Sequence, residues 1–227
     1  MYLGIKKQLS KEELEILNVL ESLDEKCFDD LYAETSFVDN IVTPFKNRYN
    51  KHNFIWEEGA TKGVLIFPSL GFVIKIPFVG DADWYDFYGA NNSENCWDYC
   101  AAEAELYEAA EEEGLEKAFA KTEFLCEIHG HPIYKQQYVE TFFNTSNDSH
   151  HSNSHQYACD INEYCDEFDI YCFNQVWVND SCEYYGKDFV FKLLSFIKEK
   201  EIDDLHNANI GYIGKQPLLV DYSSFNN

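Results

Sequence analysis

Residues 204–223 read DLHNANIGYIGKQPLLVDYS, two short acidic motifs separated by an apolar segment that contains glycine. The segment predicts two short strands joined by a turn, so Asp204, Asn209 and Asp221 should converge at one end of a hairpin. Carboxylate and amide oxygens suit Mg²⁺ bound together with nucleotide phosphates. A further Asp nearby can orient or deprotonate an attacking hydroxyl. For either motif alone, an Asx-rich turn with a satisfied strand-end Asp is the competing interpretation.

A lone lysine stands in an apolar run upstream. Residues 53–79 contain β-rich segments punctuated by Gly and Pro, which predict an antiparallel meander. Gly59 and Gly63 lie in its first connection, and Lys75 lies within Val73 to Ile76. Burying this lysine is costly unless it is paired, whereas an edge-strand lysine can extend outward to solvent.

The remaining elements alternate between helical and extended patterns. A capping box at Ser10 begins an expected helix that ends near residue 23. Further helices are expected over 93–116 and 188–200, and a hairpin over 122–139. This order predicts an α+β chain whose helices and strands are segregated into two lobes.

These motifs together resemble the protein-kinase-like superfamily, in which a Gly-rich loop, a strand Lys, a helix Glu, a hinge, D-x-x-x-x-N and D-F-G follow one another. The D-L-H-x-x-N form at 204–209 is similar to that of aminoglycoside-phosphotransferase-like and other atypical kinases, and Asp221-Tyr222-Ser223 takes the D-F-G position. The resemblance implies a two-lobed kinase-like fold. Its parts would be a helical extension (1–52), a β-rich N-lobe with the hinge (53–140) and a reduced, mainly helical C-lobe (141–227).

The resemblance also implies roles for individual residues. Asp204 would be the catalytic Asp, and Lys75 would contact the α- and β-phosphates. A Glu of the helix over 93–116 would hold Lys75. We prefer Glu103, whose neighbours at −3, +3 and +4 place it on an apolar face, and Glu105 is the alternative.

The implied cofactors are ATP and Mg²⁺. Asn209 and Asp221 would bind the metal. The residues expected to contact the nucleotide, the last two through hinge backbone groups around adenine, are Gly59, Gly63, Lys75, Gln137 and Val139.

The charge of the chain limits its partners. The 227 residues include 41 Asp plus Glu and 17 Lys plus Arg, which gives a formal net charge of −24. Direct binding to nucleic acid or to an anionic membrane needs clustered basic residues, so both are disfavoured. Lys62, Lys75 and Mg²⁺ are the local positive charges at an ATP site, and nucleotide binding should therefore depend on the metal. No apolar segment has the length of a signal peptide or a membrane span, which predicts a cytoplasmic protein.

The expected function is an ATP/Mg-dependent phosphotransferase that acts on a protein or small-molecule hydroxyl. Only four residues follow Ser223, so the family's peptide-docking elements look absent. A pseudokinase, or an acidic protein that binds a basic partner such as a nucleic-acid enzyme, is therefore the alternative. Two alternatives stay open for a histidine-rich tract: it binds a soft metal, or it is a solvated polar loop. Its candidate ligands are His150, His151, His155 and Cys159.

Overall fold

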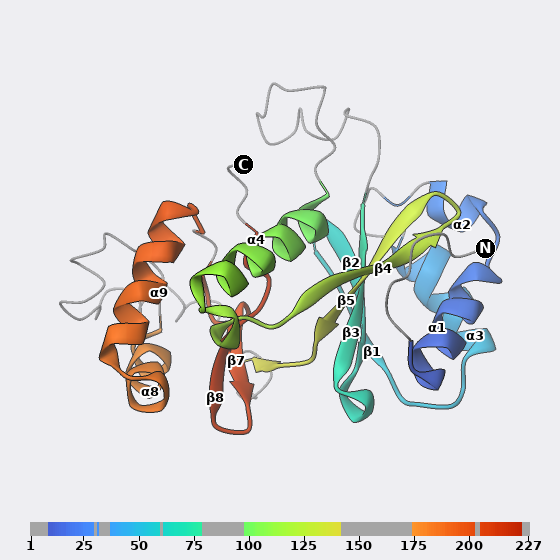
Figure 1. Cartoon of the computed structure of the whole chain (residues 1–227). Helices are drawn as coiled ribbons and strands as arrows, with labels where there is room; N and C mark the ends of the chain where they lie inside the picture. Colours follow the sequence, from blue (N-terminus) through green and yellow to red (C-terminus); the bar gives the residue numbers. More distant parts are fainter. Residues whose placement is uncertain are drawn as a thin grey trace. The chain divides into compact units, whose positions relative to one another are not determined.

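The computed structural model (Figure 1) describes residues 9–29, 31, 37–59, 61–78, 98–141, 174–202 and 205–223. The chain is α+β, and its named strands pair in antiparallel fashion, as the element order predicts. It divides into two compact units. Unit 1 comprises Met1–Ala101 and Thr122–Gln136, and unit 2 comprises Ala102–Lys121 and Gln137–Asn227.

Unit 1 contains a five-stranded sheet in the order β1-β2-β3-β5-β4. The predicted meander and the predicted hairpin are both confirmed. The 3₁₀ turn η2 (Pro68–Leu70) connects the second strand to the third. The strands are β1 (Ile55–Glu58), β2 (Lys62–Phe67), β3 (Phe72–Pro77), β4 (Thr122–Ile128) and β5 (His131–Gln137).

The register of β2 and β3 separates the side chains of this sheet onto two faces. Val64 lies opposite Lys75, and Gly63 lies opposite Ile76. Because successive side chains of a strand alternate between faces, Lys62, Val64 and Lys75 share one face. The other face carries the apolar residues Leu65, Phe67, Phe72, Ile74 and Ile76, which all belong to one buried cluster.

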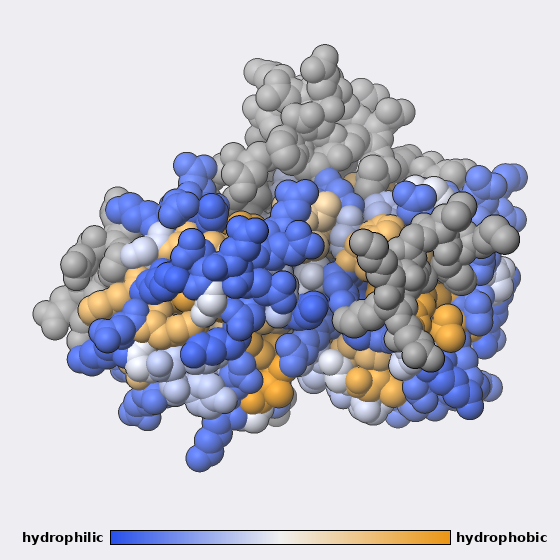
Figure 2. Space-filling view, in the orientation of Figure 1, coloured by the Kyte–Doolittle hydropathy of each residue, from blue (hydrophilic) through white to orange (hydrophobic). Residues whose placement is uncertain are grey.

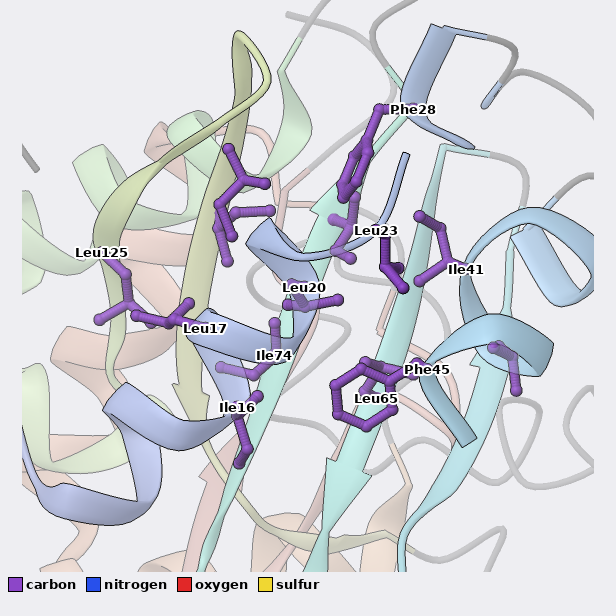
Figure 3. Packing of buried hydrophobic residues seen from close by; sticks show 14 of the residues in the cluster. Ile16, Leu17, Leu20, Leu23, Phe28, Ile41, Phe45, Leu65, Ile74 and Leu125 are labelled. Carbon is purple, nitrogen blue, oxygen red and sulfur yellow. The ribbon is translucent and has the colours of Figure 1, made fainter. Parts of the chain in front are cut away.

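The N-terminal helices supply the other half of that cluster. They are α1 (Lys11–Glu21), α2 (Lys26–Asp29), the π-helical turn η1 (Val38–Val42) and α3 (Thr43–Arg48). Figure 3 shows Leu17 and Leu20 of α1 among side chains from the strands, including Ile74. The helices before residue 52 are therefore integral to the core of unit 1.

The predicted capping box of α1 is confirmed. The Ser10 hydroxyl accepts a hydrogen bond from the Glu13 N–H at 3.1 Å, and the Ser10 N–H donates to the Glu13 carboxylate at 2.6 Å. Lys135 of β5 forms an ion pair with the same carboxylate. Desolvation raises the pKa of Glu13, but the bonds from Lys135 and Ser10 outweigh it and leave the pKa below its usual value. The start of α1 is thus joined to the sheet.

Unit 2 is mainly helical. Helix α4 (Tyr99–Glu113) begins in unit 1 and continues into unit 2. The unit also contains η4 (Glu116–Ala118), β6 (Glu140–Thr141), α8 (Gln175–Tyr185), α9 (Lys187–Glu199), β7 (Ile210–Ile213) and β8 (Gln216–Leu219). The last two strands form the predicted terminal hairpin, and β6 pairs with β7. Across the described residues, none of the helices is both long and apolar enough to cross a membrane.

Candidate functional site

Lys75 lies in the middle of β3 and is only 3% exposed. The connection before β2 is tight, because the Gly59 N–H donates to the Lys62 carbonyl at 3.0 Å. The ladder between β2 and β3 also continues past Lys62, where the Phe78 N–H donates to the Thr61 carbonyl at 2.8 Å. The strand that faces Lys75 therefore has a fixed backbone from its first residue.

The two predicted glycines have different surroundings. A Cβ added at Gly63 would lie 2.4 Å from ring carbons of Phe37, a fully buried residue of the N-terminal core. Close packing against Phe37 thus accounts for the glycine at 63, on the face away from Lys75. A Cβ added at Gly59 would meet only the Lys62 carbonyl oxygen, at 3.7 Å. Contact of either glycine with a nucleotide stays a prediction.

Glu103 lies on α4 and is fully buried, whereas Glu105 is exposed. The start of this helix is fixed in unit 1, since the Asp98 carboxylate accepts from the Cys100 and Ala101 N–H groups at 3.0 Å. Among the described residues the structure buries four charged side chains: Glu13, Lys62, Lys75 and Glu103. Two of the four are therefore the lysine and the glutamate that the resemblance selects.

The predicted hinge residues follow β5. The Gln137 N–H donates to the Lys121 carbonyl at 3.0 Å, so this N–H already has an acceptor. Val139 is 5% exposed and packs in a small apolar cluster with Ala120, Leu218 and Val220. Adenine binding by backbone groups at 137 and 139 stays a prediction.

The terminal hairpin brings Asn209 and Asp221 to one end. Asn209 immediately precedes β7, and the Val220 N–H donates to the Asn209 carbonyl at 2.8 Å. Asn209 is 5% exposed. Asp221 has a left-handed backbone with φ 49°, a conformation that costs energy and that clusters at functional sites, although Asp tolerates it better than most residues. Asn209 and Asp221 therefore lie at the same end of the hairpin. Asp204 lies outside the described residues, so the convergence of all three stays a prediction.

The turn before Asn209 is held by its own histidine. The His206 ring accepts at Nδ1 from the Ala208 N–H at 3.1 Å. The His206 carbonyl accepts from the Asn209 N–H at 2.8 Å. His206 therefore acts as a structural residue of this turn.

Sequence reasoning missed Asn174, which is 6% exposed and joins this turn to α8. Its side-chain amide donates to the Asn207 Oδ1 at 2.9 Å. Its carbonyl oxygen caps α8 by accepting from the Val176 N–H at 2.8 Å and the Trp177 N–H at 3.4 Å. An Asn directly before a helix is the available sequence signal for the cap, but its second partner lies 33 residues away.

We expect Asn174→Ala to lower the free energy of unfolding by about 1–2 kcal/mol, because it removes the helix cap. Asn174→Asp retains the capping oxygen but loses the donor to Asn207, so it should cost about 0.5–1 kcal/mol, less than Asn174→Ala. Urea denaturation monitored by circular dichroism measures both variants against wild type. If both variants lowered the free energy of unfolding by the same amount, the helix cap would not be what Asn174 contributes to stability.

Two tyrosines fix the hairpin to α8. The Tyr212 hydroxyl of β7 donates to the Asp180 carboxylate at 2.7 Å. Burial raises the pKa of Tyr212, and the bond to Asp180 raises it further. The Tyr185 hydroxyl lies 2.6 Å from the carbonyl oxygens of Lys117 and Pro217, and burial raises the pKa of Tyr185 to about 12. Both hydroxyls stay protonated at neutral pH and act as structural donors.

The residue after Asp221 is anchored in the core of unit 2. Tyr222 is fully buried, and its hydroxyl donates to the Ala120 carbonyl at 2.9 Å. Its ring meets Phe119 edge to face at 5.0 Å. In addition, the Ala120 N–H donates to the Leu219 carbonyl at 2.7 Å. The backbone of Asp221 is therefore held between a strand and a buried tyrosine.

Within the described ranges no group of three or more His, Cys, Asp or Glu side chains is arranged to hold a metal ion. The tract of His150, His151, His155 and Cys159 lies outside those ranges. Comparisons of the chain with protein-family models, with curated proteins and with solved structures found no match.

Proposed function

We propose that the chain has a two-lobed kinase-like fold, binds ATP with Mg²⁺ and transfers a phosphoryl group to a hydroxyl of a protein or small molecule. Lys75 would contact the α- and β-phosphates, and Glu103 would hold Lys75. Asn209 and Asp221 would bind the metal, and Asp204 would accept the proton of the attacking hydroxyl.

The observation that carries this proposal is the burial of Lys75 and Glu103. Charged side chains are almost never fully buried unless a partner compensates them. Kinases place a lysine on the third strand and its glutamate partner on the helix that follows. Lys75 is on the third strand of the unit 1 sheet, and Glu103 is on α4, the next helix among the described residues. A solvated acidic helix face would not account for the full burial of Glu103.

The terminal hairpin supports the metal-binding part of the proposal. Asn209 and Asp221 flank two short strands and meet at one end through the Val220–Asn209 hydrogen bond. One amide and one carboxylate are an oxygen-ligand set that suits Mg²⁺ together with phosphate oxygens. When bound, Mg²⁺ neutralises charge on the phosphates, which matters for an anionic ligand on a chain of net charge −24.

An exposed acidic helix face favours the second candidate, a non-catalytic protein that docks a basic partner. The visible surface over α4 is mostly hydrophilic in Figure 2. The exposed carboxylates of this helix are Glu105, Glu108, Glu111, Glu112 and Glu113. Such a face attracts a basic protein at low salt.

Phosphoryl transfer separates the two candidates. Incubating the protein with Mg²⁺ and ATP labelled at the γ-phosphate should yield labelled product or inorganic phosphate. We expect Asp204→Asn to lower that rate by about 100-fold or more while ATP binding is kept. Equal rates in the two proteins would contradict the proposed role of Asp204. Binding without turnover by wild type would favour the non-catalytic candidate.

A further inference from the structure

We propose that the outer edge of β1 is a dimer interface, at which a second copy of this chain adds its own β1 in antiparallel fashion. The inference is independent of the proposed phosphotransferase function. β1 is an edge strand of the unit 1 sheet, whose strand order is β1-β2-β3-β5-β4. The outer side of an edge strand presents N–H and C=O groups that can pair with another chain.

The hydrogen-bond pattern of β1 shows which residue faces outward. Just after the strand, the Gly59 N–H donates to the Lys62 carbonyl of β2 at 3.0 Å. Residues bonded to a neighbouring strand alternate along an antiparallel pair, so Glu57 and Ile55 also bond to β2. Trp56, which lies between them, therefore directs its backbone N–H and C=O away from β2, and no described strand pairs with β1 on that side.

Two adjacent apolar side chains of this edge strand are exposed to solvent. Ile55 is 47% exposed and Trp56 is 40% exposed. A second β1 laid along the edge covers both side chains, which removes apolar surface from water in addition to pairing the backbone. The other large apolar side chains that are exposed among the described residues stand singly in the sequence: Leu14, Phe124, Val176 and Tyr184.

Glu57 selects the register of the two strands. By the same alternation Glu58 faces outward, so Trp56 of one copy can exchange backbone hydrogen bonds with Trp56 or Glu58 of the other. Pairing Trp56 with Glu58 would set the two Glu57 side chains directly opposite each other, where like charges destabilise a strand pair. A shift the other way, with Trp56 opposite Phe54, leaves Glu57 beyond the start of the second β1. Pairing Trp56 with Trp56 sets each Glu57 opposite Ile55, so we place the two-fold axis at Trp56.

A cation lies beside this edge although the chain as a whole is strongly acidic. The Lys46 ammonium group of α3 lies 5.8 Å from the centre of the Trp56 ring. In the register centred on Trp56, the two tryptophan rings are neighbours on one face, so each Lys46 lies near both rings and can form a cation–π contact with either. This local positive charge offsets part of the repulsion between two chains that each carry a net charge of −24.

Sedimentation velocity of the full chain, from about 2 µM to about 500 µM, tests the interface. Because the paired strands are short, we expect a dimer with a dissociation constant of about 10–100 µM. Both copies carry the same net charge, so dimerisation should strengthen as the salt concentration rises. Docking of a basic partner on the acidic face of α4 would weaken under the same change.

Two substitutions at Trp56 test the pairing and its register. Trp56→Lys and Trp56→Glu each place like charges opposite each other, so each variant alone should raise the dissociation constant at least about tenfold. An equal mixture of the two variants should recover the dimer, because opposite charges then meet at the axis. Tyr184→Lys, the change of another exposed aromatic residue to lysine, should leave the dimer unchanged.

A wild-type chain that stays monomeric at about 500 µM in high salt would overturn the inference. So would a dimer that Trp56→Lys leaves intact or that Tyr184→Lys weakens equally. A mixture of the Lys and Glu variants that stays monomeric would overturn the register centred on Trp56. If circular dichroism shows that Trp56→Lys is unfolded, Trp56→Thr replaces it, because threonine suits an exposed strand position and still removes the ring. The same loss of the dimer is then expected.

Discussion

Asp221→Asn is expected to remove most of the increase in melting temperature that Mg-ATP gives to the wild-type protein. At a concentration 100 times its dissociation constant, a ligand stabilises the folded state by about 2.7 kcal/mol. For a chain of this length that corresponds to a rise of about 5–10 °C. Asn retains the size of the residue and tolerates its left-handed backbone, but it removes the one carboxylate of the proposed ligand pair and with it the charge that attracts Mg²⁺. Differential scanning fluorimetry measures the shift.

Asp188→Asn is the matched control for this variant. Asp188 is an exposed residue in the first turn of α9. The substitution makes the same change of charge and should leave the Mg-ATP shift intact. If Mg-ATP raised the melting temperature of Asp221→Asn as much as that of wild type, Asp221 would not bind the metal. Loss of this increase in both variants would indicate a general effect of charge.

The largest effect on stability is expected from Tyr222→Ala, which should lower the free energy of unfolding by about 3–5 kcal/mol. The substitution deletes a fully buried ring packed against Phe119. Tyr222→Phe keeps the ring and loses only the hydrogen bond to the Ala120 carbonyl, so it should cost about 1–2 kcal/mol. Urea denaturation measures both values.

Tyr184→Ala provides a matched comparison, because Tyr184 is 53% exposed. Its ring contacts Tyr185, and Tyr184→Ala should lower the free energy of unfolding by less than about 1.5 kcal/mol. If Tyr222→Ala lowered the free energy of unfolding no more than Tyr184→Ala, this would contradict the claim that Tyr222 anchors the backbone of Asp221 in the core of unit 2. Equal effects of Tyr222→Phe and Tyr222→Ala would assign the anchoring to the hydroxyl instead of the ring.

Segments with a strong local pattern were predictable from the sequence. The capping box at Ser10 and the apolar stripe of α9 are short-range signals, and both helices form where expected. The hairpins follow from alternating residues around Gly-containing turns, and the structure confirms them. By contrast, residues 24–52 have no clear period. Their helices depend on burying Phe28, Phe37 and Phe45 in the core that includes the sheet, a contact that no local pattern encodes.

The same limit applies to the candidate site. Helical spacing favoured Glu103 over Glu105, and burial now separates the two residues. Asn174, however, contacts a turn 33 residues away, which spacing cannot reveal. The shared face of Lys62 and Lys75 requires the register of β2 against β3, because a shift of one residue would place them on opposite faces.

Thermal melting of the wild-type protein with ATP tests the central claim most directly, in parallel samples with Mg²⁺ and with EDTA. If the chain binds Mg-ATP through Lys75 and Asp221, saturating ATP with Mg²⁺ should raise the melting temperature by about 5–10 °C. ATP with EDTA, or Mg²⁺ alone, should raise it by less than a third of that. No shift with Mg-ATP, or an equal shift with EDTA, would contradict metal-dependent nucleotide binding.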